Sequence, residues 1–298
     1  MIGVSGRMPQ TRREFLQKAT AGAAGLAVGA QFAIQDTRAA KGGTNMRIGM
    51  CDWSMRQRGT VDAIPLAKEL GLDGVEVSVG PNVGEPGLRD PAKQQAYLDA
   101  CREHGVAVAS LALGSTFNRN PLKSEPKCAI WLVDAIPIIK NMGATNILLA
   151  FFGRAEIKMD EEEDVQRIVD VLKECAPRAE QHGVVLGLEN TLSAEDNIRI
   201  LEMVDHPSVR VYYDPKNSAG RGRDVPEEIR TLKDLICQVH VKNGPKLLSE
   251  KVDLDFPACA EALKEIGYDG WYVLETSSPN DLVSDTKANI EYVRQTFG

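Results

Sequence analysis

The sequence predicts a single-domain (β/α)8 (TIM) barrel, and three observations lead to this prediction. From Met46 onward, short apolar or β-branched runs alternate with longer amphipathic stretches, the pattern of βα units around a parallel sheet. Eight such units can be counted. Glycine follows the predicted helix at five junctions, where it accommodates a left-handed cap. An open doubly wound sheet would show the same junctions, but the count of eight favours closure.

The first half of the barrel is predicted from four strand–helix units. Its strands are short apolar runs, expected at Arg47–Asp52, Gly74–Val79, Val106–Leu113 and Asn146–Ala150. Its helices are longer and amphipathic, expected at Val61–Leu70, Pro91–His104, Pro126–Met142 and Glu161–His182. Each helix is closed by a glycine, at Gly71, Gly105, Gly143 and Gly183. Glycine just past the last periodic residue is a helix stop signal.

The second half repeats the pattern. Its strands are expected at Val184–Glu189, Val209–Asp214, Ile236–Val241 and Gly270–Glu275. Its helices are expected at Ala194–Val204, Pro226–Leu235, Phe256–Ile266 and Asp281–Phe297, with Gly267 after the third. Several strands are continuous apolar runs, as expected where helices cover the sheet. We therefore assign residues 46–298 to the barrel.

Composition limits the class of partner. The chain has 298 residues, of which 43% are hydrophobic and 26% charged, values typical of a globular protein. A net charge of −7 argues against a nucleic-acid partner, because Lys and Arg supply most phosphate binding. Neither a Gly-x-Gly-x-x-Gly after the first strand nor a phosphate-binding Gly-x-x-x-x-Gly-Lys-Ser/Thr occurs. The six cysteines include no Cys-x-x-Cys pair, so we expect free, buried thiols rather than disulfides.

The N-terminal segment resembles a twin-arginine export signal. Arg12-Arg13-Glu14-Phe15-Leu16 precedes the uncharged, Ala/Gly-rich run from Ala19 to Ala30. That run is too short and too rich in glycine for a stable membrane span. We therefore expect residues 1–40 to be a signal peptide and linker, with cleavage near Ala30 or Ala39. The predicted partner during export is the twin-arginine translocase, and the predicted location is periplasmic or extracellular.

Each of the last four predicted strands ends in a metal-ligating residue: Glu189, Asp214, His240 or Glu275. The carboxyl ends of barrel strands meet at one face, where active sites of this fold form. Four such groups converging there need a cation, since an unpaired buried charge is costly. Three carboxylates and one imidazole suit Mn²⁺, Mg²⁺ or Co²⁺ at least as well as Zn²⁺. The identity of the metal stays open.

These motifs resemble the xylose-isomerase-like superfamily of sugar phosphate isomerases and epimerases. The resemblance covers residues 46–298 and is carried by Leu188-Glu189-Asn190, Tyr213-Asp214-Pro215-Lys216-Asn217, Val239-His240-Val241-Lys242 and Leu274-Glu275-Thr276. It implies a divalent-metal-dependent isomerase or epimerase that acts on a small sugar or keto-sugar. It also implies that Glu189 and Glu275 form the acid/base pair. Proton abstraction next to a carbonyl would then proceed through an enediolate.

The same resemblance suggests substrate-binding residues. Glu195 and Lys246 match positions that contact substrate hydroxyls, while Asn217 stands where ketose epimerases have a histidine and Lys246 where they have an arginine. Glu76 and Trp53, near the ends of the first two strands, are expected to line the same pocket. Glu195 could instead occupy the first turn of a helix, and Lys246 could be solvated. Trp53 could serve packing alone.

Alternatives of other classes remain. An exported lyase on 3-keto-glycosides would begin with the same enolisation, and a sugar-binding barrel without turnover would keep the fold. Endonuclease IV shares the superfamily fold but uses a histidine-rich three-zinc cluster. This chain has four histidines, and we expect structural roles for His104, His182 and His206 at helix ends or in a turn. Whether the subunits form a homo-oligomer is left open.

Overall fold

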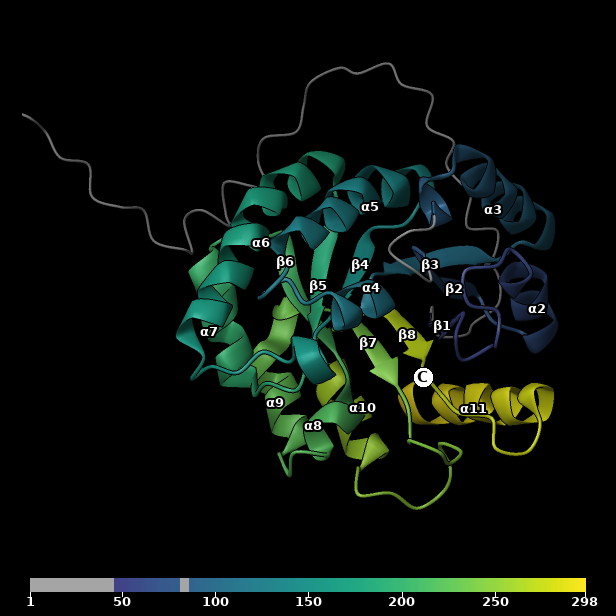
Figure 1. The fold of residues 1–298 in the computed structure, drawn as a ribbon. Coiled ribbons are helices and arrows are strands. Elements are labelled where there is room, and N and C mark those ends of the chain that lie inside the picture. Colours follow the sequence, from purple (N-terminus) through teal and green to yellow (C-terminus); the bar gives the residue numbers. More distant parts are fainter. Residues whose placement is uncertain (1–45, 81–85) are drawn as a thin grey trace, which may run out of the picture. The chain divides into compact units, whose positions relative to one another are not determined.

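Eight parallel strands close into a barrel in the order β1 to β8 (Figure 1). The computed structural model describes residues 46–80 and 86–298, and the expected export signal lies outside them. The strands are β1 Arg47–Cys51, β2 Gly74–Ser78, β3 Ala107–Ala112, β4 Asn146–Ala150, β5 Val185–Glu189, β6 Val209–Tyr213, β7 Ile236–Val241 and β8 Trp271–Leu274. Pairing of β1 with β8 closes the sheet. The predicted barrel is thus confirmed.

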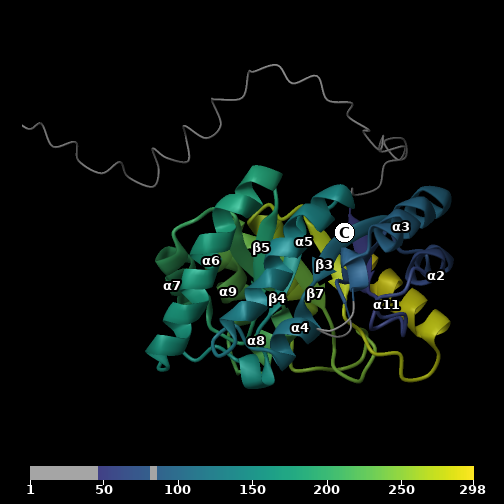
Figure 2. The ribbon, with the colours of Figure 1, turned by 45° about the horizontal axis from the view of Figure 1, so that its top comes forward.

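Helices surround the strands, as the turned view in Figure 2 shows. The α-helices are α2 Ala63–Leu70, α3 Pro91–His104, α4 Gly114–Arg119, α5 Ala129–Asn141, α6 Glu162–His182, α7 Ala194–Val204, α8 Pro215–Ala219, α9 Val225–Leu232, α10 Phe256–Glu265 and α11 Leu282–Phe297. Short 3-10 turns lie at Gly87–Arg89, Pro126–Cys128, Gly153–Ala155 and Lys233–Leu235. Two predicted helices, 126–142 and 226–235, are therefore each divided into an α-helix and a 3-10 turn.

The five predicted helix-ending glycines all have left-handed backbone conformations. Their φ angles are +84° at Gly71, +64° at Gly105, +78° at Gly143, +66° at Gly183 and +71° at Gly267. A side chain added at any of them would meet nothing within 4 Å. Glycine is therefore needed for the backbone conformation rather than for space. These caps turn each chain segment from a helix back into the next strand.

The main apolar core lies between the strands and the surrounding helices, and the interior of the barrel is different. Two small apolar clusters occur there, one of Cys51, Ala109 and Val273 and one of Ala112, Leu148 and Tyr212. Between them lie fully buried polar side chains, including those of Glu76, Ser110, Gln238 and His240. A barrel of this fold is usually filled by layers of branched apolar residues. The polar interior therefore points to the site.

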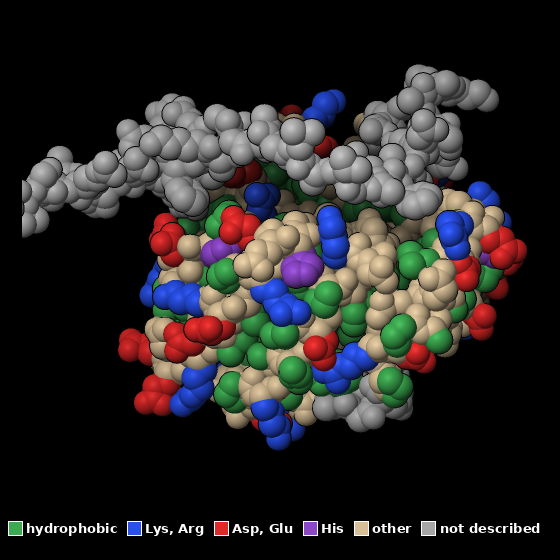
Figure 3. Space-filling view, turned by 90° about the horizontal axis from the view of Figure 1, so that it is seen from above, with side chains coloured by type: hydrophobic (Ala, Val, Ile, Leu, Met, Phe, Trp, Pro, Cys, Tyr) green, Lys and Arg blue, Asp and Glu red, His purple; other side chains and the backbone are tan. Residues whose placement is uncertain are grey.

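The cysteines and the helices bear on the expectations about disulfides and membrane spans. All six cysteines are free, four of them buried and two partly buried. No helix in the described part of the chain combines the length and apolar composition that a membrane span needs. On the face that Figure 3 presents, acidic and basic side chains are interspersed over the uncovered surface.

Candidate metal centre

Glu189, Asp214, His240 and Glu275 come together at the carboxyl ends of the last four strands, and we call them the candidate metal centre. Each offers one ligand atom, and these atoms all lie within 4.8 Å of one another. Glu189 ends β5 and His240 lies in β7, while Asp214 and Glu275 directly follow β6 and β8. The convergence expected from the strand ends is therefore present.

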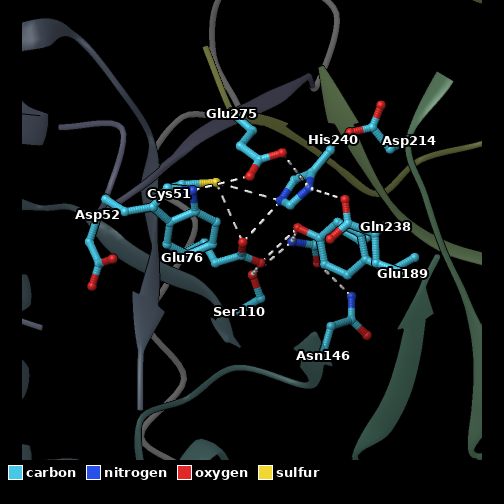
Figure 4. A network of polar contacts seen from close by, with 12 residues as sticks. Cys51, Asp52, Glu76, Ser110, Asn146, Glu189, Asp214, Gln238, His240 and Glu275 are labelled. Atoms are coloured by element: carbon cyan, nitrogen blue, oxygen red, sulfur yellow. Dashed lines mark hydrogen bonds and ion pairs between the residues drawn. The ribbon is translucent and has the colours of Figure 1, made fainter. Parts of the chain in front are cut away.

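The imidazole of His240 is the centre of the cluster (Figure 4). Its Nδ1 lies 3.0 Å from Glu189 Oε1 and 3.6 Å from Glu275 Oε2. Its Nε2 lies 3.0 Å from Glu76 Oε1, on the other side of the ring. The Trp53 and Tyr212 rings pack against it, with centroids 6.3 and 4.5 Å away. The ring is thus fixed in one orientation by contacts on every side.

Asp214 has a second role that orients its carboxylate. Its Oδ1 accepts hydrogen bonds from the backbone N–H groups of Lys216, at 2.8 Å, and Asn217, at 3.0 Å, and so caps α8. The other oxygen, Oδ2, is buried without a well-aligned hydrogen bond, although Lys242 Nζ lies 2.8 Å away as an ion pair. One carboxylate oxygen is thus held by the helix and the other is turned into the cluster.

Lys242 is a member of this region that sequence reasoning passed over. Its Nζ also lies 2.7 Å from Glu275 Oε2. Lys242 directly follows β7 and lies two residues after His240, so the side-chain alternation of the strand, continued by one residue, brings both side chains to the same face. That period-two spacing was the signal that could have identified it.

The two glutamates differ in electrostatic environment. Burial raises the pKa of Glu189 to about 7, although His240 opposes this shift. Burial would also raise the pKa of Glu275, but the charges of His240 and Lys242 and hydrogen bonds from Lys242 and Trp53 bring it below its ordinary value. Carboxyl groups whose environments separate their pKa values are a common arrangement in acid/base sites.

The donor set fits a divalent cation. Three carboxylates face the cluster, and Lys242 alone does not balance them. The Asp214 oxygen without a well-aligned donor is the kind of buried acceptor that a cation would satisfy. Carboxylate oxygens with one imidazole nitrogen suit Mg²⁺, Mn²⁺, Co²⁺ or Zn²⁺. The residues present could therefore hold such an ion.

A cavity of about 230 Å³ adjoins the candidate metal centre, and Glu189 and Glu275 form part of its wall. Other lining residues are Trp53, Arg58, Ser78, Ser115 and Asn118. Pockets for drug-sized ligands usually exceed 300 Å³, so this volume suits a small molecule. Helix α4 contributes Ser115 and Asn118, and this helix was not predicted from the sequence.

Comparison with known proteins shows the family to which the chain belongs. Residues 64–296 match the family described as "Xylose isomerase-like TIM barrel". The chain belongs to this family.

Proteins that are similar to this chain include named sugar epimerases. An L-ribulose-5-phosphate 3-epimerase UlaE of Salmonella heidelberg is 30% identical over 231 residues, which cover 71% of this chain and 80% of that protein. Among solved structures, D-psicose 3-epimerase from Clostridium cellulolyticum has a TM-score of 0.72 at 18% identity, covering 85% and 99% of the two chains. The structure of 3-keto-D-glucoside 4-epimerase YcjR from E. coli has a TM-score of 0.67 at 16% identity, covering 84% and 99%. The structural likenesses show the shared fold.

Within this family barrel, two expected substrate residues touch the candidate metal centre. Trp53 Nε1 donates a hydrogen bond to Glu275 Oε1 at 3.2 Å, and its ring lines the cavity. Asn217 Nδ2 donates to Glu189 Oε1 at 3.3 Å. Both side chains could therefore orient the glutamates as well as meet a ligand.

Three other expected substrate residues are placed differently. Glu76 is fully buried beneath His240 and does not line the cavity, which corrects its assignment to the pocket wall. Glu195 is exposed in the first turn of α7. Lys246 is exposed, and its Nζ donates to the carbonyl oxygen of Lys251 at 3.1 Å. The structure therefore gives Glu195 and Lys246 no contact with the cavity.

Proposed function

We propose that this protein is a divalent-metal-dependent sugar isomerase or epimerase that moves a proton next to a carbonyl group. The observation that carries the proposal is the placement of Glu189 and Glu275, which are members of the candidate metal centre and also walls of the adjoining cavity. Family relatives named as L-ribulose-5-phosphate 3-epimerase support this class of reaction. The small, partly polar cavity supports a small sugar or keto-sugar as substrate.

Each site residue has a task in this reaction. Glu189, Asp214, His240 and Glu275 would hold the ion. When bound, the ion supplies a positive charge that acidifies the C–H next to the substrate carbonyl. The two glutamates both face Nδ1 of the His240 ring (Figure 4). One glutamate removes the proton and the other returns one to the neighbouring carbon or oxygen.

Neighbouring side chains keep the two glutamates ready for this exchange. The Trp53 indole donates to Glu275 and the Asn217 amide donates to Glu189. Each bond orients one carboxylate oxygen, and correct orientation of a general base contributes directly to rate. Trp53 also covers the cavity beside Arg58, whose guanidinium lies 5.5 Å from the ring centroid. A substrate hydroxyl or anionic group would meet that guanidinium at the cavity wall.

Export by the twin-arginine translocase, to the periplasm or the cell exterior, is part of the same proposal. It is supported by Arg12-Arg13-Glu14-Phe15-Leu16 and the uncharged run behind it. An exported enzyme would meet free or glycosidic sugars outside the cytosol. A fusion of residues 1–45 to a reporter protein tests this: export that survives Arg12→Lys with Arg13→Lys would contradict it.

Solvent-deuterium exchange tests the proposed reaction. Purified protein with Mn²⁺ is incubated in D₂O with ketopentoses and ketohexoses, and label at the carbons flanking the carbonyl is measured by NMR. We expect incorporation with the wild type and background levels with Glu189→Gln or Glu275→Gln. Glu174→Gln, an exposed position on α6, is the matched control and should exchange normally. Wild-type exchange no faster than that of Glu275→Gln with every sugar would reject the proposal.

Two related measurements separate the alternatives. Incubation with 3-keto-glycosides, followed by mass spectrometry of the released aglycone, detects a lyase, and absence of release excludes that activity for the glycosides used. Metal analysis addresses a sugar-binding barrel without turnover. Protein that is free of metal and fails to bind added Mn²⁺ would favour that alternative.

A further inference from the structure

A chain of hydrogen bonds runs through the interior of the barrel beneath the candidate metal centre (Figure 4). Its members come from five strands and are Asn146, Gln238, Ser110, Tyr212 and Glu76, which we call the buried relay. Four of them are at most 1% exposed, and Asn146 is half-buried. Buried polar groups are costly unless satisfied, so the complete pairing of this set needs an explanation.

The direction of the relay is fixed at its lower end by a backbone group. Asn146 Nδ2 lies 3.3 Å from the carbonyl oxygen of Cys237 and 2.7 Å from Gln238 Oε1. A backbone carbonyl can only accept a hydrogen bond, so the amide nitrogen of Asn146 must face it. The same nitrogen then donates to Gln238, whose side-chain oxygen must face Asn146. Because the Cys237 carbonyl can only accept, it fixes which end of each side-chain amide is nitrogen and which is oxygen, in Asn146 and in Gln238.

The orientation passes from Gln238 to two hydroxyl groups. Gln238 Nε2 donates to Ser110 Oγ and to Tyr212 OH, both at 2.9 Å. Each hydroxyl has one proton of its own, and that proton is directed at Glu76 Oε2, at 2.6 Å from Ser110 and 2.8 Å from Tyr212. Glu76 Oε2 thus accepts two hydrogen bonds.

The last step reaches His240. Glu76 Oε1 lies 3.0 Å from His240 Nε2 and 3.5 Å from Cys51 Sγ. Of the two Glu76 oxygens, Oε1 is the one that faces the imidazole, and it lies opposite Nε2. A neutral imidazole has a single N–H, so an ion bound at Nδ1 would leave that proton on Nε2, where it is donated to Glu76 Oε1. The opposite nitrogen, Nδ1, faces Glu189 Oε1 at 3.0 Å and Glu275 Oε2 at 3.6 Å, on the side where an ion would be bound.

We propose that Glu76 is a positioning residue that holds His240 as its Nε2–H tautomer, so that Nδ1 is the metal-binding atom. The buried relay sets the direction of every hydrogen bond leading to it. The inference rests on the proposed metal site and adds the residue that prepares its one nitrogen ligand. Carboxylate partners of metal-binding histidines typically change metal affinity by about 10- to 100-fold.

A second metal ion is an alternative explanation for the contacts around Glu76. Cys51, Glu76 and His240 have ligand atoms close enough to hold an ion of their own. The relay accounts for the Glu76 contacts without one, because each is a hydrogen bond from a neutral donor or from His240. The proposal therefore expects one ion per chain, bound through Nδ1.

NMR of the wild-type protein tests the tautomer directly. The full chain is labelled with ¹⁵N-histidine and loaded with Zn²⁺ as a diamagnetic probe, and the His240 signal is identified by its loss in His240→Asn. We expect the proton on Nε2 and the zinc-shifted resonance at Nδ1. A proton on Nδ1, or a ring without a proton because both nitrogens bind metal, would overturn the proposal. This measurement does not depend on the folding of any Glu76 variant.

Titration with Mn²⁺ tests the contribution of Glu76 to affinity. We expect Glu76→Gln to weaken binding at least tenfold and Tyr212→Phe to weaken it less. Glu228→Gln is the matched control, because Glu228 is a buried carboxylate that accepts from Ala194 N and Tyr213 OH at 3.0 Å and the structure gives it no contact with His240. It should bind Mn²⁺ as the wild type does.

Three results of that titration would contradict the inference. They are Glu76→Gln binding within twofold of the wild type, equal weakening by Glu228→Gln, and two Mn²⁺ ions per chain. None of these measurements uses turnover. Metal bound through Nδ1 without sugar exchange would therefore reject the proposed function and leave the role of Glu76 intact.

Discussion

Lys242 Nζ lies 2.8 Å from Asp214 Oδ2. The ammonium group is therefore paired with a carboxylate oxygen that a bound metal ion would also need as a ligand. A divalent cation bound at the proposed site would therefore compete with the lysine for the same carboxylate. We expect Lys242→Met to bind Mn²⁺ more tightly by roughly tenfold, equivalent to about 1.4 kcal/mol. Calorimetric titration measures this, with the exposed Lys246→Met as control. Unchanged or weaker binding by Lys242→Met would show that the ammonium does not compete.

Trp53 should matter for rate through a single hydrogen bond. Trp53→Phe keeps an aromatic ring beside Arg58 but removes the donor to Glu275 Oε1. Hydrogen bonds to charged groups contribute about 1.5–3 kcal/mol, and the lower value corresponds to a loss of roughly tenfold in the deuterium-exchange rate. Trp271→Phe, in β8 at the start of the strand, controls for loss of an indole. Equal rates for Trp53→Phe and the wild type would remove Trp53 from the orienting role.

Asp52 makes the stability of the fold depend on pH. It is buried after β1, accepts from the backbone N–H groups of Gly59 and Ser78 at 2.8 Å, and burial raises its pKa from 3.8 to about 6. The folded chain then binds more protons than the unfolded chain between about pH 4 and 6. The contribution of Asp52 to the free energy of unfolding consequently falls as the pH rises from about 4 to about 6, and it stays low at higher pH.

Asp52→Asn should remove this dependence. Relative to the wild type, its free energy of unfolding should increase between pH 4 and 6 by at most about 3 kcal/mol, since one pKa unit corresponds to about 1.4 kcal/mol. Urea unfolding of both proteins at several pH values gives the difference. A difference that stays constant across the window would mean that Asp52 titrates normally.

Gly187 in β5 should tolerate no side chain. A Cβ there would lie 2.9 Å from Cys237 Sγ and 3.1 Å from Tyr212 Cβ. We expect Gly187→Ala to lower the free energy of unfolding by about 1–3 kcal/mol, as overpacking usually does. Gly114→Ala is the control, because its Cβ would meet only Ala150 Cβ at an ordinary 3.6 Å. Equal urea midpoints for the two variants would contradict the expected clash.

Much of the barrel could be predicted because each strand is a short apolar run with a polar residue or glycine at its end. β4 and β7 have the predicted bounds, and the other strands differ by one residue at one or both ends. Helices α4 and α8 were not predicted because they are only six and five residues long. Too few residues remain there for a 3.6-residue period to show.

The candidate metal centre could also be predicted, because its four members end successive strands on one face of the barrel. The role of Glu76 could not, because it depends on pairing across the barrel interior. Ser78 lines the cavity, whereas Glu76 lies two residues deeper on β2. No local pattern in the sequence indicates that Glu76 on β2 contacts His240 on β7.

The buried relay begins at Asn146, the first residue of β4, which belongs to the rim of the barrel opposite the cavity. In barrels of this fold that rim usually serves stability alone. Here the hydrogen bonds of the buried relay connect the lower rim of the barrel to the candidate metal centre. If Glu76 has the proposed role, we expect repacking of the lower rim for thermal resistance to change cation affinity at the mouth as well.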